Sequence, residues 1–284
     1  MQNKNAITYY PNQRLEKGWI TIWGELFRNI FSSRDMIFQL FKRDFTAQYK
    51  KSFLGLNWTL ITPLFGIASW VLMQMTGILT PGEVGVPYPI YVLVGTSCWS
   101  VFMGIIGSSS STLSAASGLL LQIKFHHEAV FIEQILLNIV NTMISFVMIL
   151  IGISLFDVFP KWQTVFFPLL IVPIFFYAAS FGLLIAMMKI VAIDISNLVN
   201  KLMNFIIYTA PIIYAPTIDN LFLRLVNKWN PLTYIICSMR DLILYGRVYN
   251  WEGLLISSAL GLFLFAIVWR AFYVSEDKLI ERMV

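Results

Sequence analysis

The stretch that decides the fold is Thr164–Met188, TVFFPLLIVPIFFYAASFGLLIAMM, which contains no charged residue. At about 1.5 Å per residue, a helix over this range is longer than the roughly 30 Å hydrocarbon layer of a bilayer. Within lipid, a helix satisfies all of its own backbone polar groups, and a long unbroken apolar run favours it over a barrel strand. The stretch therefore predicts a transmembrane helix in an all-α membrane protein.

Further apolar stretches lie on both sides of this one. They are Leu56–Leu79, Pro89–Ser109, Phe131–Phe156, Leu202–Ala215 and Gly253–Trp269. Leu202–Ala215 is short, and it spans a bilayer only if its helix begins near Ser196 or if protein surrounds it. We expect six transmembrane helices in a domain over 56–272, between a cytoplasmic segment at 1–55 and a cytoplasmic tail at 273–284.

The composition agrees with lipid as the main solvent. Of 284 residues, 58% are hydrophobic and 12% are charged, whereas soluble domains carry about 25% charged residues. Cys98 and Cys237, the only cysteines, have neither zinc-site nor CxxC spacing, so we expect them to be small apolar fillers. The polar N-terminal segment has no apolar core of a signal peptide, so we expect no cleaved leader.

The positive charges predict the orientation. Nine of the 20 lysines and arginines precede the first span, and six more fall on the same side of a six-span topology. The excess of positive charge marks the cytoplasmic side, so both termini are expected there. The net charge of +5 is thus a topology signal, and no nucleic-acid partner is expected.

The residues before the first span form an amphipathic pattern. Hydrophobic side chains, Trp19 and Trp23 among them, recur every three or four residues over Leu15–Phe31, and Arg28 lies on the polar face. Such a helix lies flat at a membrane surface. It either anchors the chain or forms a docking surface for a cytoplasmic partner, and the two roles are compatible.

The cytoplasmic connection Thr112–Val130 predicts a short helix with an apolar and a charged side, which suits a cleft on a partner protein. Its polar and aromatic residues gather in the second half: Lys124, Phe125, His126, His127 and Glu128. His127 and Glu128 do not begin an HExxH zinc motif, because Phe131 occupies the position of the second histidine. An exposed polar pair is the simpler interpretation, and no metal site is expected.

The outer connection Thr217–Glu252 predicts a pair of short helices. Pro231 divides its apolar residues into two segments, each too short to cross a membrane, which favours a re-entrant or interfacial element. Arg240 and Asp241 lie on the second segment. Their charges are either solvated or paired with neighbours, or Arg240 binds an anion.

The chemistry that the chain lacks narrows its function. The cores of the predicted spans carry no charge of the kind that ion-coupled carriers use. No GxxxxGK[ST] loop is present to bind ATP phosphates, and no catalytic constellation is visible, although Asp219 and Asp241 leave room for one. We therefore expect a transport protein with no catalytic residue or cofactor of its own, whose energy source lies outside this chain.

Aromatic residues supply candidate walls for a transport path. Within or beside the predicted first, second and fifth spans lie Phe65, Trp70, Tyr88, Tyr91, Trp99, Phe102, Phe205, Tyr208 and Tyr214. Rings near span ends are common at any bilayer interface. Alternatively they line a path, where their faces suit contact with the C–H faces of sugars.

A specific pattern surrounds the start of the first span. It reads RD-x4-Y-x2-S-x-LG-x2-W-x4-P and consists of Arg43, Asp44, Tyr49, Ser52, Leu54, Gly55, Trp58 and Pro63. This pattern resembles the permease subunits of bacterial ABC exporters for polysaccharides: O-antigen, capsule and teichoic acid. The segment with Asn230, Pro231, Arg240 and Asp241 is similar to the outer re-entrant pair of that family.

The resemblance implies a homodimer in the bacterial plasma membrane, bound to two copies of a P-loop ATPase that carries ATP and magnesium. ATP binding would act on Leu15–Phe31 and on Lys124–Glu128, although this chain has Phe125-His126 where the family often has Phe-Pro. The implied cargo is a lipid-linked glycan, whose phosphate Arg240 would meet. The alternatives are an ABC exporter permease for a drug, lipid or peptide, a membrane enzyme acting on lipid-linked sugars, and a passive channel.

Overall fold

The computed structural model describes residues 18–50, 57–120, 127–154 and 156–281. Over these residues all regular structure is helical, which confirms the predicted all-α class. In order, the elements are α1 Trp19–Ser32, α2 Arg34–Lys50, α3 Asn57–Met75, α4 Tyr88–Leu120, α5 His127–Ser154, the 3-10 helix η1 Trp162–Phe166, α6 Phe167–Val191, α7 Ile193–Phe205, the 3-10 turn η2 Ile206–Tyr208, α8 Leu221–Trp229, α9 Pro231–Leu244 and α10 Trp251–Glu281.

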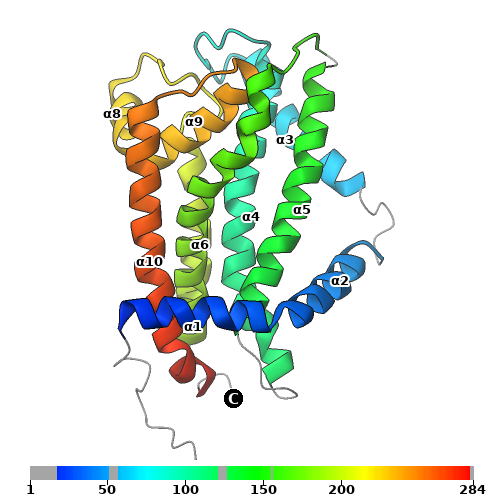
Figure 1. Cartoon of the computed structure of the whole chain (residues 1–284). Coiled ribbons are helices and arrows are strands. Elements are labelled where there is room, and N and C mark those ends of the chain that lie inside the picture. Colours follow the sequence, from blue (N-terminus) through cyan, green and yellow to red (C-terminus); the bar gives the residue numbers. More distant parts are fainter. Residues whose placement is uncertain (1–17, 51–56, 121–126, 155, 282–284) are drawn as a thin grey trace, which may run out of the picture.

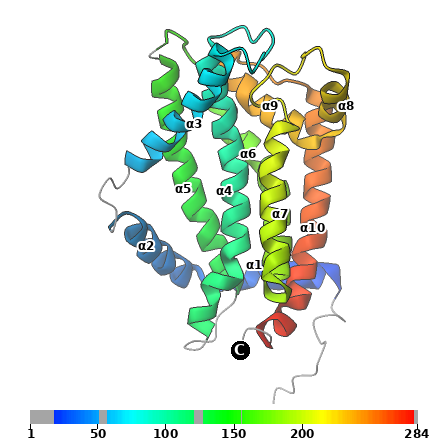
Figure 2. The same cartoon turned by 180° about the vertical axis from the view of Figure 1, so that it is seen from behind.

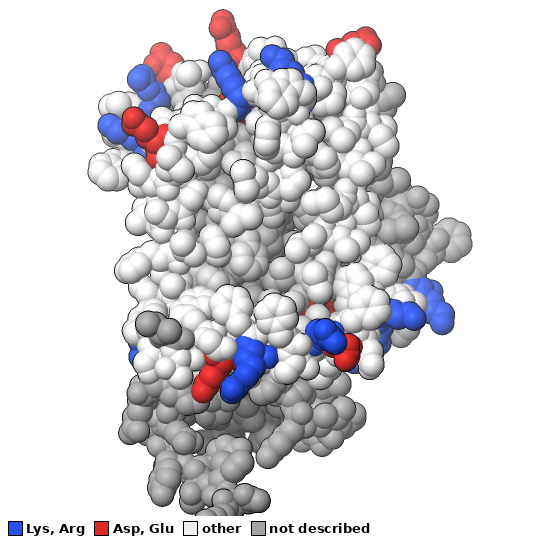
Figure 3. All heavy atoms as spheres, viewed as in Figure 1, with Lys and Arg blue, Asp and Glu red and all other residues white. Residues whose placement is uncertain are grey.

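Four of the predicted spans are long, apolar helices. Within the described residues, Tyr88–Ser114, Glu128–Ser154, Trp162–Val191 and Trp251–Ser275 are long and apolar enough to cross a membrane. They run side by side (Figure 1). On the face of the molecule seen in Figure 1, charged residues gather toward the two ends of the helix bundle, and uncharged residues lie between them (Figure 3). This distribution is the one expected of a protein whose middle contacts lipid.

Close helix contacts hold α6 at the centre, between α4 and α10. A Cβ at Gly182 would lie only 2.4 Å from Cβ of Ser109 and 2.8 Å from the carbonyl oxygen of Ile106. Only glycine therefore fits where α6 crosses α4. Small residues play this role in membrane bundles, because association there depends on close packing.

The predicted fifth span is a helix only in its first part. The chain reverses at Ala192, between α6 and α7 (Figure 2), and helical structure ends at Tyr208. The prediction of a helix across Leu202–Ala215 is therefore wrong beyond Tyr208. Pro211 explains the change, since proline has no backbone N–H and disfavours helical backbone before it. Yet all residues of Ala210–Ala215 are buried.

The long helix α4 replaces part of a predicted connection. It continues past the expected end of the second span to Leu120, so the separate short helix expected within Thr112–Val130 is wrong for its first part. The hydroxyl of Ser111 donates to the carbonyl oxygen of Ser108 at 2.9 Å, within the helix. Such bonds let the serine run remain helical. Residues 121–126 of the connection lie outside the described part of the chain.

The outer connection contains the expected pair of short helices, α8 and α9, separated at Asn230 and Pro231. Asn230 caps α9, accepting a hydrogen bond from the backbone N–H of Leu232 at 3.0 Å through Oδ1. Pro231 takes the first helical position, where its missing N–H costs nothing. The two helices lie at the opposite end of the bundle from α1 (Figure 1).

Helix α1 is amphipathic, as predicted, and crosses the base of the bundle (Figure 1). Ile22 and Leu26 are buried, whereas Phe27 and Phe31 are 56% and 73% exposed. Residues 15–17 of the predicted segment lie outside the described residues. Helix α2 follows and packs against α5.

Candidate functional site

The candidate path-lining aromatics fall into two groups. Five lie inside the bundle, each 6% exposed or less: Tyr88, Tyr91, Trp99, Phe102 and Tyr214. The other candidates lie on α3, α7 and η2, which flank α4 on the side seen in Figure 2. Here Phe65, Phe205 and Tyr208 are at least half exposed, and Trp70 meets Tyr208 edge-on with 6.1 Å between ring centroids. We call these four residues the aromatic face.

The buried tyrosines hold a stretch of irregular backbone. Residues 209–216, here called the irregular segment, lack a helical hydrogen-bond ladder of their own. The hydroxyl of Tyr88 donates to the carbonyl oxygen of Ile213 at 3.0 Å, and that of Tyr91 donates to the carbonyl oxygen of Tyr214 at 2.9 Å. An unpartnered buried carbonyl costs about 1–3 kcal/mol. Side chains of α4 therefore replace bonds that a continuous helix would make itself.

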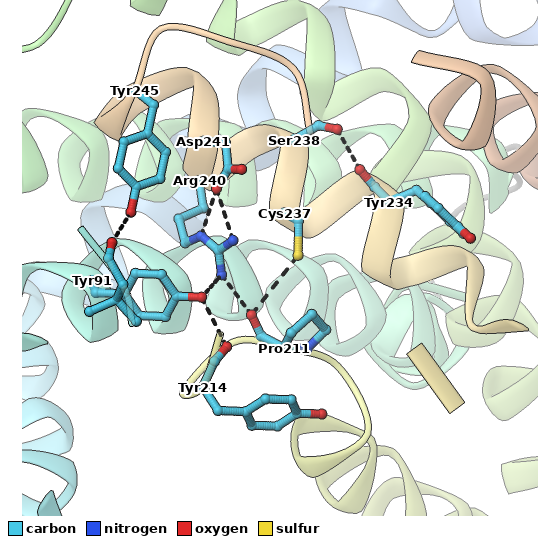
Figure 4. Close-up of polar contacts among 10 residues, drawn as sticks. Tyr91, Pro211, Tyr214, Tyr234, Cys237, Ser238, Arg240, Asp241 and Tyr245 are labelled. Atoms are coloured by element: carbon cyan, nitrogen blue, oxygen red, sulfur yellow. Dashed lines mark hydrogen bonds and ion pairs between the residues drawn. The ribbon is translucent and has the colours of Figure 1, made fainter. Parts of the chain in front are cut away.

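Arg240 supports the same segment from α9 (Figure 4). Its Nη1 donates to the carbonyl oxygen of Pro211 at 2.7 Å and to the hydroxyl of Tyr91. Nε and Nη2 both donate to Oδ1 of Asp241, at 2.9 and 2.8 Å. The guanidinium carbon also lies 4.3 Å from the centre of the Tyr91 ring.

This geometry separates the interpretations of Arg240 and Asp241. Their side chains are 2% and 6% exposed and form an ion pair. The prediction that these charges are either solvated or paired with neighbours is confirmed in the form of pairing. Because every nitrogen of the Arg240 guanidinium donates to an acceptor of the chain itself, the structure gives this residue a supporting role.

Asparagines tie α8 and α9 to the preceding residues. The hydroxyl of Tyr214 lies 3.2 Å from Oδ1 of Asn227, and Nδ2 of Asn230 lies 3.5 Å from the carbonyl oxygen of Thr209. The outer helix pair, the irregular segment and the start of α4 thus form one hydrogen-bonded unit. We call it the outer cap.

A second set of contacts attaches α1 to the long helices at the other end. The hydroxyl of Tyr273 on α10 donates to Oε2 of Glu25 at 2.7 Å. The guanidinium of Arg270 lies 4.4 Å from the centre of the Trp19 ring. On α5, Glu128 accepts a hydrogen bond from Nδ2 of Asn29 at 3.4 Å. Helix α1 therefore bridges α10 and the start of α5.

The predicted coupling residues have different positions in the structure. Trp23 is partly buried and Arg28 is exposed, while Glu128 is 2% exposed and contacts α1. Lys124, Phe125 and His126, and the side chain of His127, lie outside the described part of the chain.

The family pattern at the first span is described only in part. Arg43 and Asp44 on α2 form a bidentate ion pair, at 2.5 and 2.9 Å, and this pair raises the pKa of Arg43. Of the remaining pattern, Ser52, Leu54 and Gly55, and the side chains of Tyr49, Trp58 and Pro63, lie outside the described part of the chain.

The prediction that the interiors of the spans carry no charge is wrong at one position. Glu133 is 1% exposed and lies within the span Glu128–Ser154.

The comparisons with known proteins fit these observations. The model of the family "ABC-2 type transporter" matches residues 36–244. The chain belongs to the ABC-2 transporter family. It is similar to the O-antigen export system permease protein RfbA of Myxococcus xanthus, with 23% identity over 89% of this chain and 96% of that protein. It is also similar to the protein of the same name from Klebsiella pneumoniae, with 20% identity over 77% and 83%.

Membership in the ABC-2 family, together with four apolar helices, makes the chain a transport subunit that crosses the inner membrane several times. The family match extends from α2 to the end of α9, so it contains the outer cap and the aromatic face. Among the described side chains, no three His, Cys, Asp or Glu residues come together where they would hold a metal ion.

Sequence reasoning missed the partners within the outer cap. Tyr88 and Tyr91 were interpretable as interface or path residues, and Asn227 and Cys237 carried no signal of their own. A signal was present in Pro211, since a proline inside an apolar stretch leaves carbonyl groups that need donors from elsewhere. The thiol of Cys237 lies 3.9 Å from the Pro211 carbonyl oxygen, among those donors.

Proposed function

We propose that this chain is the membrane-spanning permease of an ATP-driven exporter that moves a lipid-linked polysaccharide from the cytoplasm across the inner membrane. The observation that carries the proposal is the similarity, over 96% of its length, to a permease named for O-antigen export. In this proposal a separate ATPase subunit binds ATP and magnesium and supplies the energy. The alternative is an exporter of the same architecture for a drug, lipid or peptide.

The proposed topology has six spans, with α3 and α7 as the two short ones and both termini in the cytoplasm. The buried surroundings of the irregular segment support the fifth span, because non-helical backbone at membrane depth requires protein partners. In this topology the α8–α9 pair enters the outer leaflet from outside and returns. The outer cap then fixes that pair against α4.

The aromatic face is the proposed wall of the glycan path. Three of its four rings, Phe65, Phe205 and Tyr208, are at least half exposed, and Figure 2 shows α4 between α3 and α7 on the same side. Helix α4 also exposes Ser100, Gly107 and Ser114 at intervals of seven residues, on one helical face. Rings beside small and hydroxyl-bearing residues suit a sugar chain, which has apolar C–H faces and hydroxyl edges. Two copies facing each other across this surface would enclose a path, which is why a homodimer is proposed.

Coupling to the ATPase is assigned to α1 and to the connection at 121–126. The contacts of α1 with Arg270 and Tyr273 on α10, and with Glu128 on α5, support this assignment. Force applied to the exposed side of α1 would reach two long helices on different sides of the bundle. The exposed Arg28 and Phe27 are available on that side.

The decisive experiment is purification of the chain from its native membrane in a gentle detergent, with mass spectrometry of the bound proteins and lipids. We expect a P-loop ATPase in equal amount together with a polyprenyl-phosphate glycan. An ATPase that accompanies another cargo would support the alternative exporter. Absence of an ATPase would refute the proposal, and glycan chemistry by the chain alone without ATP would favour a membrane enzyme.

A further inference from the structure

A cavity of about 640 Å³ opens between the starts of α6 and α10, beside the turn that connects α9 to α10. Its size falls in the roughly 300–1,000 Å³ range of small-molecule sites. Its walls are mainly apolar, formed by Phe166, Leu169, Leu170, Pro173, Leu254 and Leu255. A hydrocarbon chain fits this part of the lining, because these six side chains offer no hydrogen-bonding groups.

One cation, Arg247, lines the polar end of this cavity, and the stem of a second, Lys161, runs beside the same turn. Arg247 is one of its lining residues and is exposed. The side chain of Lys161 packs against Gly246, the residue before Arg247, because a Cβ at Gly246 would lie 2.7 Å from Cδ of Lys161. Gly246 also has a φ of +66°, a conformation that favours glycine. The turn therefore brings the stem of Lys161 beside Gly246, the residue that precedes Arg247.

An uncharged acceptor adds to the polar end. Oε1 of Gln163, a lining residue, is buried, and no donor among the described residues reaches it. An unsatisfied buried acceptor in a native structure calls for a partner. Because solvent does not reach this oxygen in the structure, the Gln163 amide would have to turn toward the cavity to accept a hydrogen bond from a hydroxyl group on the occupant. The required ligand thus combines a negative charge, a hydroxyl donor and a hydrocarbon chain.

The depth of the cavity follows from two tryptophans. Trp162 and Trp251 begin two of the apolar spans and are 72% and 64% exposed. Tryptophan concentrates at the headgroup level of a bilayer. Because Trp251 also lines the cavity, the cations lie near phosphate depth, in the leaflet on the α8–α9 side. The apolar walls then continue along α6 and α10 toward the acyl chains.

We propose that this cavity binds one anionic phospholipid of the surrounding bilayer, of the phosphatidylglycerol type. The phosphate lies between Lys161 and Arg247, the glycerol headgroup donates to Gln163, and an acyl chain enters the cavity. The cavity opens between α6 and α10, which Figure 1 shows in front, whereas the aromatic face belongs to the opposite side seen in Figure 2. A bilayer lipid is therefore the occupant, and the inference does not depend on the exported cargo.

The bound lipid would stabilise the junction between the α9–α10 turn, α6 and α10. One hydrogen bond between this turn and a distant part of the chain comes from the Tyr245 hydroxyl, which donates to the carbonyl oxygen of Val84. The hydroxyl of Thr164 lies 3.4 Å from the carbonyl oxygen of Leu242. A lipid in the cavity would add contacts with α6, α10 and the turn at once. Bound lipid should accordingly raise the unfolding temperature of the purified chain.

The test is native mass spectrometry of the full chain in a neutral detergent, titrated separately with phosphatidylglycerol, phosphatidylcholine and a polyprenyl phosphate. We expect phosphatidylglycerol to bind in preference to phosphatidylcholine. The Lys161→Ala/Arg247→Ala double variant should bind it about 30-fold more weakly, from roughly a fivefold step per cation at a membrane surface. The matched control is Arg224→Ala/Lys228→Ala on α8, two exposed cations outside the cavity, which should leave binding unchanged.

A second variant tests the apolar part without altering charge. Ser258→Phe places a ring among the lining residues and should also weaken phosphatidylglycerol binding and abolish its effect on the unfolding temperature. Equal binding of phosphatidylglycerol and phosphatidylcholine would overturn the proposal, as would unchanged binding in the double variant. Binding of polyprenyl phosphate in place of phosphatidylglycerol would overturn the assignment to a bilayer lipid.

Discussion

Replacing Arg240 with alanine removes the side chain of α9 that donates hydrogen bonds to both α4 and the irregular segment. The variant leaves the carboxylate of Asp241, whose side chain is 6% exposed, without its hydrogen-bonded cation, and it leaves the Pro211 carbonyl oxygen without its 2.7 Å partner. Breaking a buried ion pair from one side typically costs about 3–5 kcal/mol, because a charge remains buried and unpaired. We therefore expect Arg240→Ala to lower the free energy of unfolding by about that amount. Since typical stabilities are roughly 5–15 kcal/mol, the loss would be large.

The assay is equilibrium unfolding of the purified chain in mild-detergent micelles titrated with sodium dodecyl sulfate, followed by circular dichroism. Arg224→Ala is the matched control, because Arg224 is exposed on α8, and it should change the free energy by less than about 0.5 kcal/mol. The double variant Arg240→Met/Asp241→Leu removes both charges and should recover much of the loss, since an apolar pair can replace a buried ion pair.

Two results would refute this reasoning. A loss below about 1 kcal/mol in Arg240→Ala would mean that the buried pair contributes little. A double variant as unstable as the single one would mean that the unpaired Asp241 charge is not the cause. If Arg240→Ala abolished export while stability stayed normal, the anion-binding interpretation would replace the supporting role.

The remaining predictions concern the path, the coupling contacts and the packing of the bundle. Phe205→Ala combined with Tyr208→Ala should reduce glycan-stimulated ATP hydrolysis of the reconstituted complex several-fold, because two exposed rings of the aromatic face are lost. Tyr273→Phe removes the 2.7 Å bond to α1 and should lower transport per ATP hydrolysed, measured in vesicles. Gly182→Ala should lower the free energy of unfolding by about 1–3 kcal/mol through overpacking, since its Cβ would meet Ser109.

Each of these predictions has a matched control. Trp162→Ala removes an equally exposed ring away from the aromatic face, and equal loss of activity would contradict the path assignment. Tyr249→Phe changes a tyrosine near the start of α10, and an equal fall in coupling would contradict the role of α1. Gly107→Ala places a Cβ where no atom lies within 4 Å, so equal destabilisation would show that close packing at Gly182 is not the cause.

Local sequence patterns predicted the parts of this fold that depend on local physics. Apolar length marks the spans beginning at Trp162 and Trp251, and the spacing of Ile22 and Leu26 marks the buried side of α1. Pro231 marks the break between α8 and α9, since it affects only its own turn. In each case the deciding interaction lies within a few residues of the pattern.

The outer cap depends on contacts between distant positions, and for that reason periodicity did not predict it. The Tyr91–Tyr214 and Arg240–Tyr91 bonds join residues separated by 123 and 149 positions. An exposed aromatic and a buried aromatic look alike in sequence, so Phe65 and Tyr88 could not be separated. Only the packing of α4 against the irregular segment distinguishes them.

The irregular segment also constrains how this sequence can change during evolution. In an ordinary helix each carbonyl is bonded by the backbone, so side chains vary independently. Here the carbonyls of Pro211, Ile213 and Tyr214 depend on side chains in α4 and α9. Losing Tyr91 removes an acceptor for Arg240 as well as a donor for Tyr214. These positions should therefore show strong epistasis. In natural relatives, a fifth span that is helical throughout should occur together with the loss of the donor side chains at Tyr88, Tyr91 and Arg240.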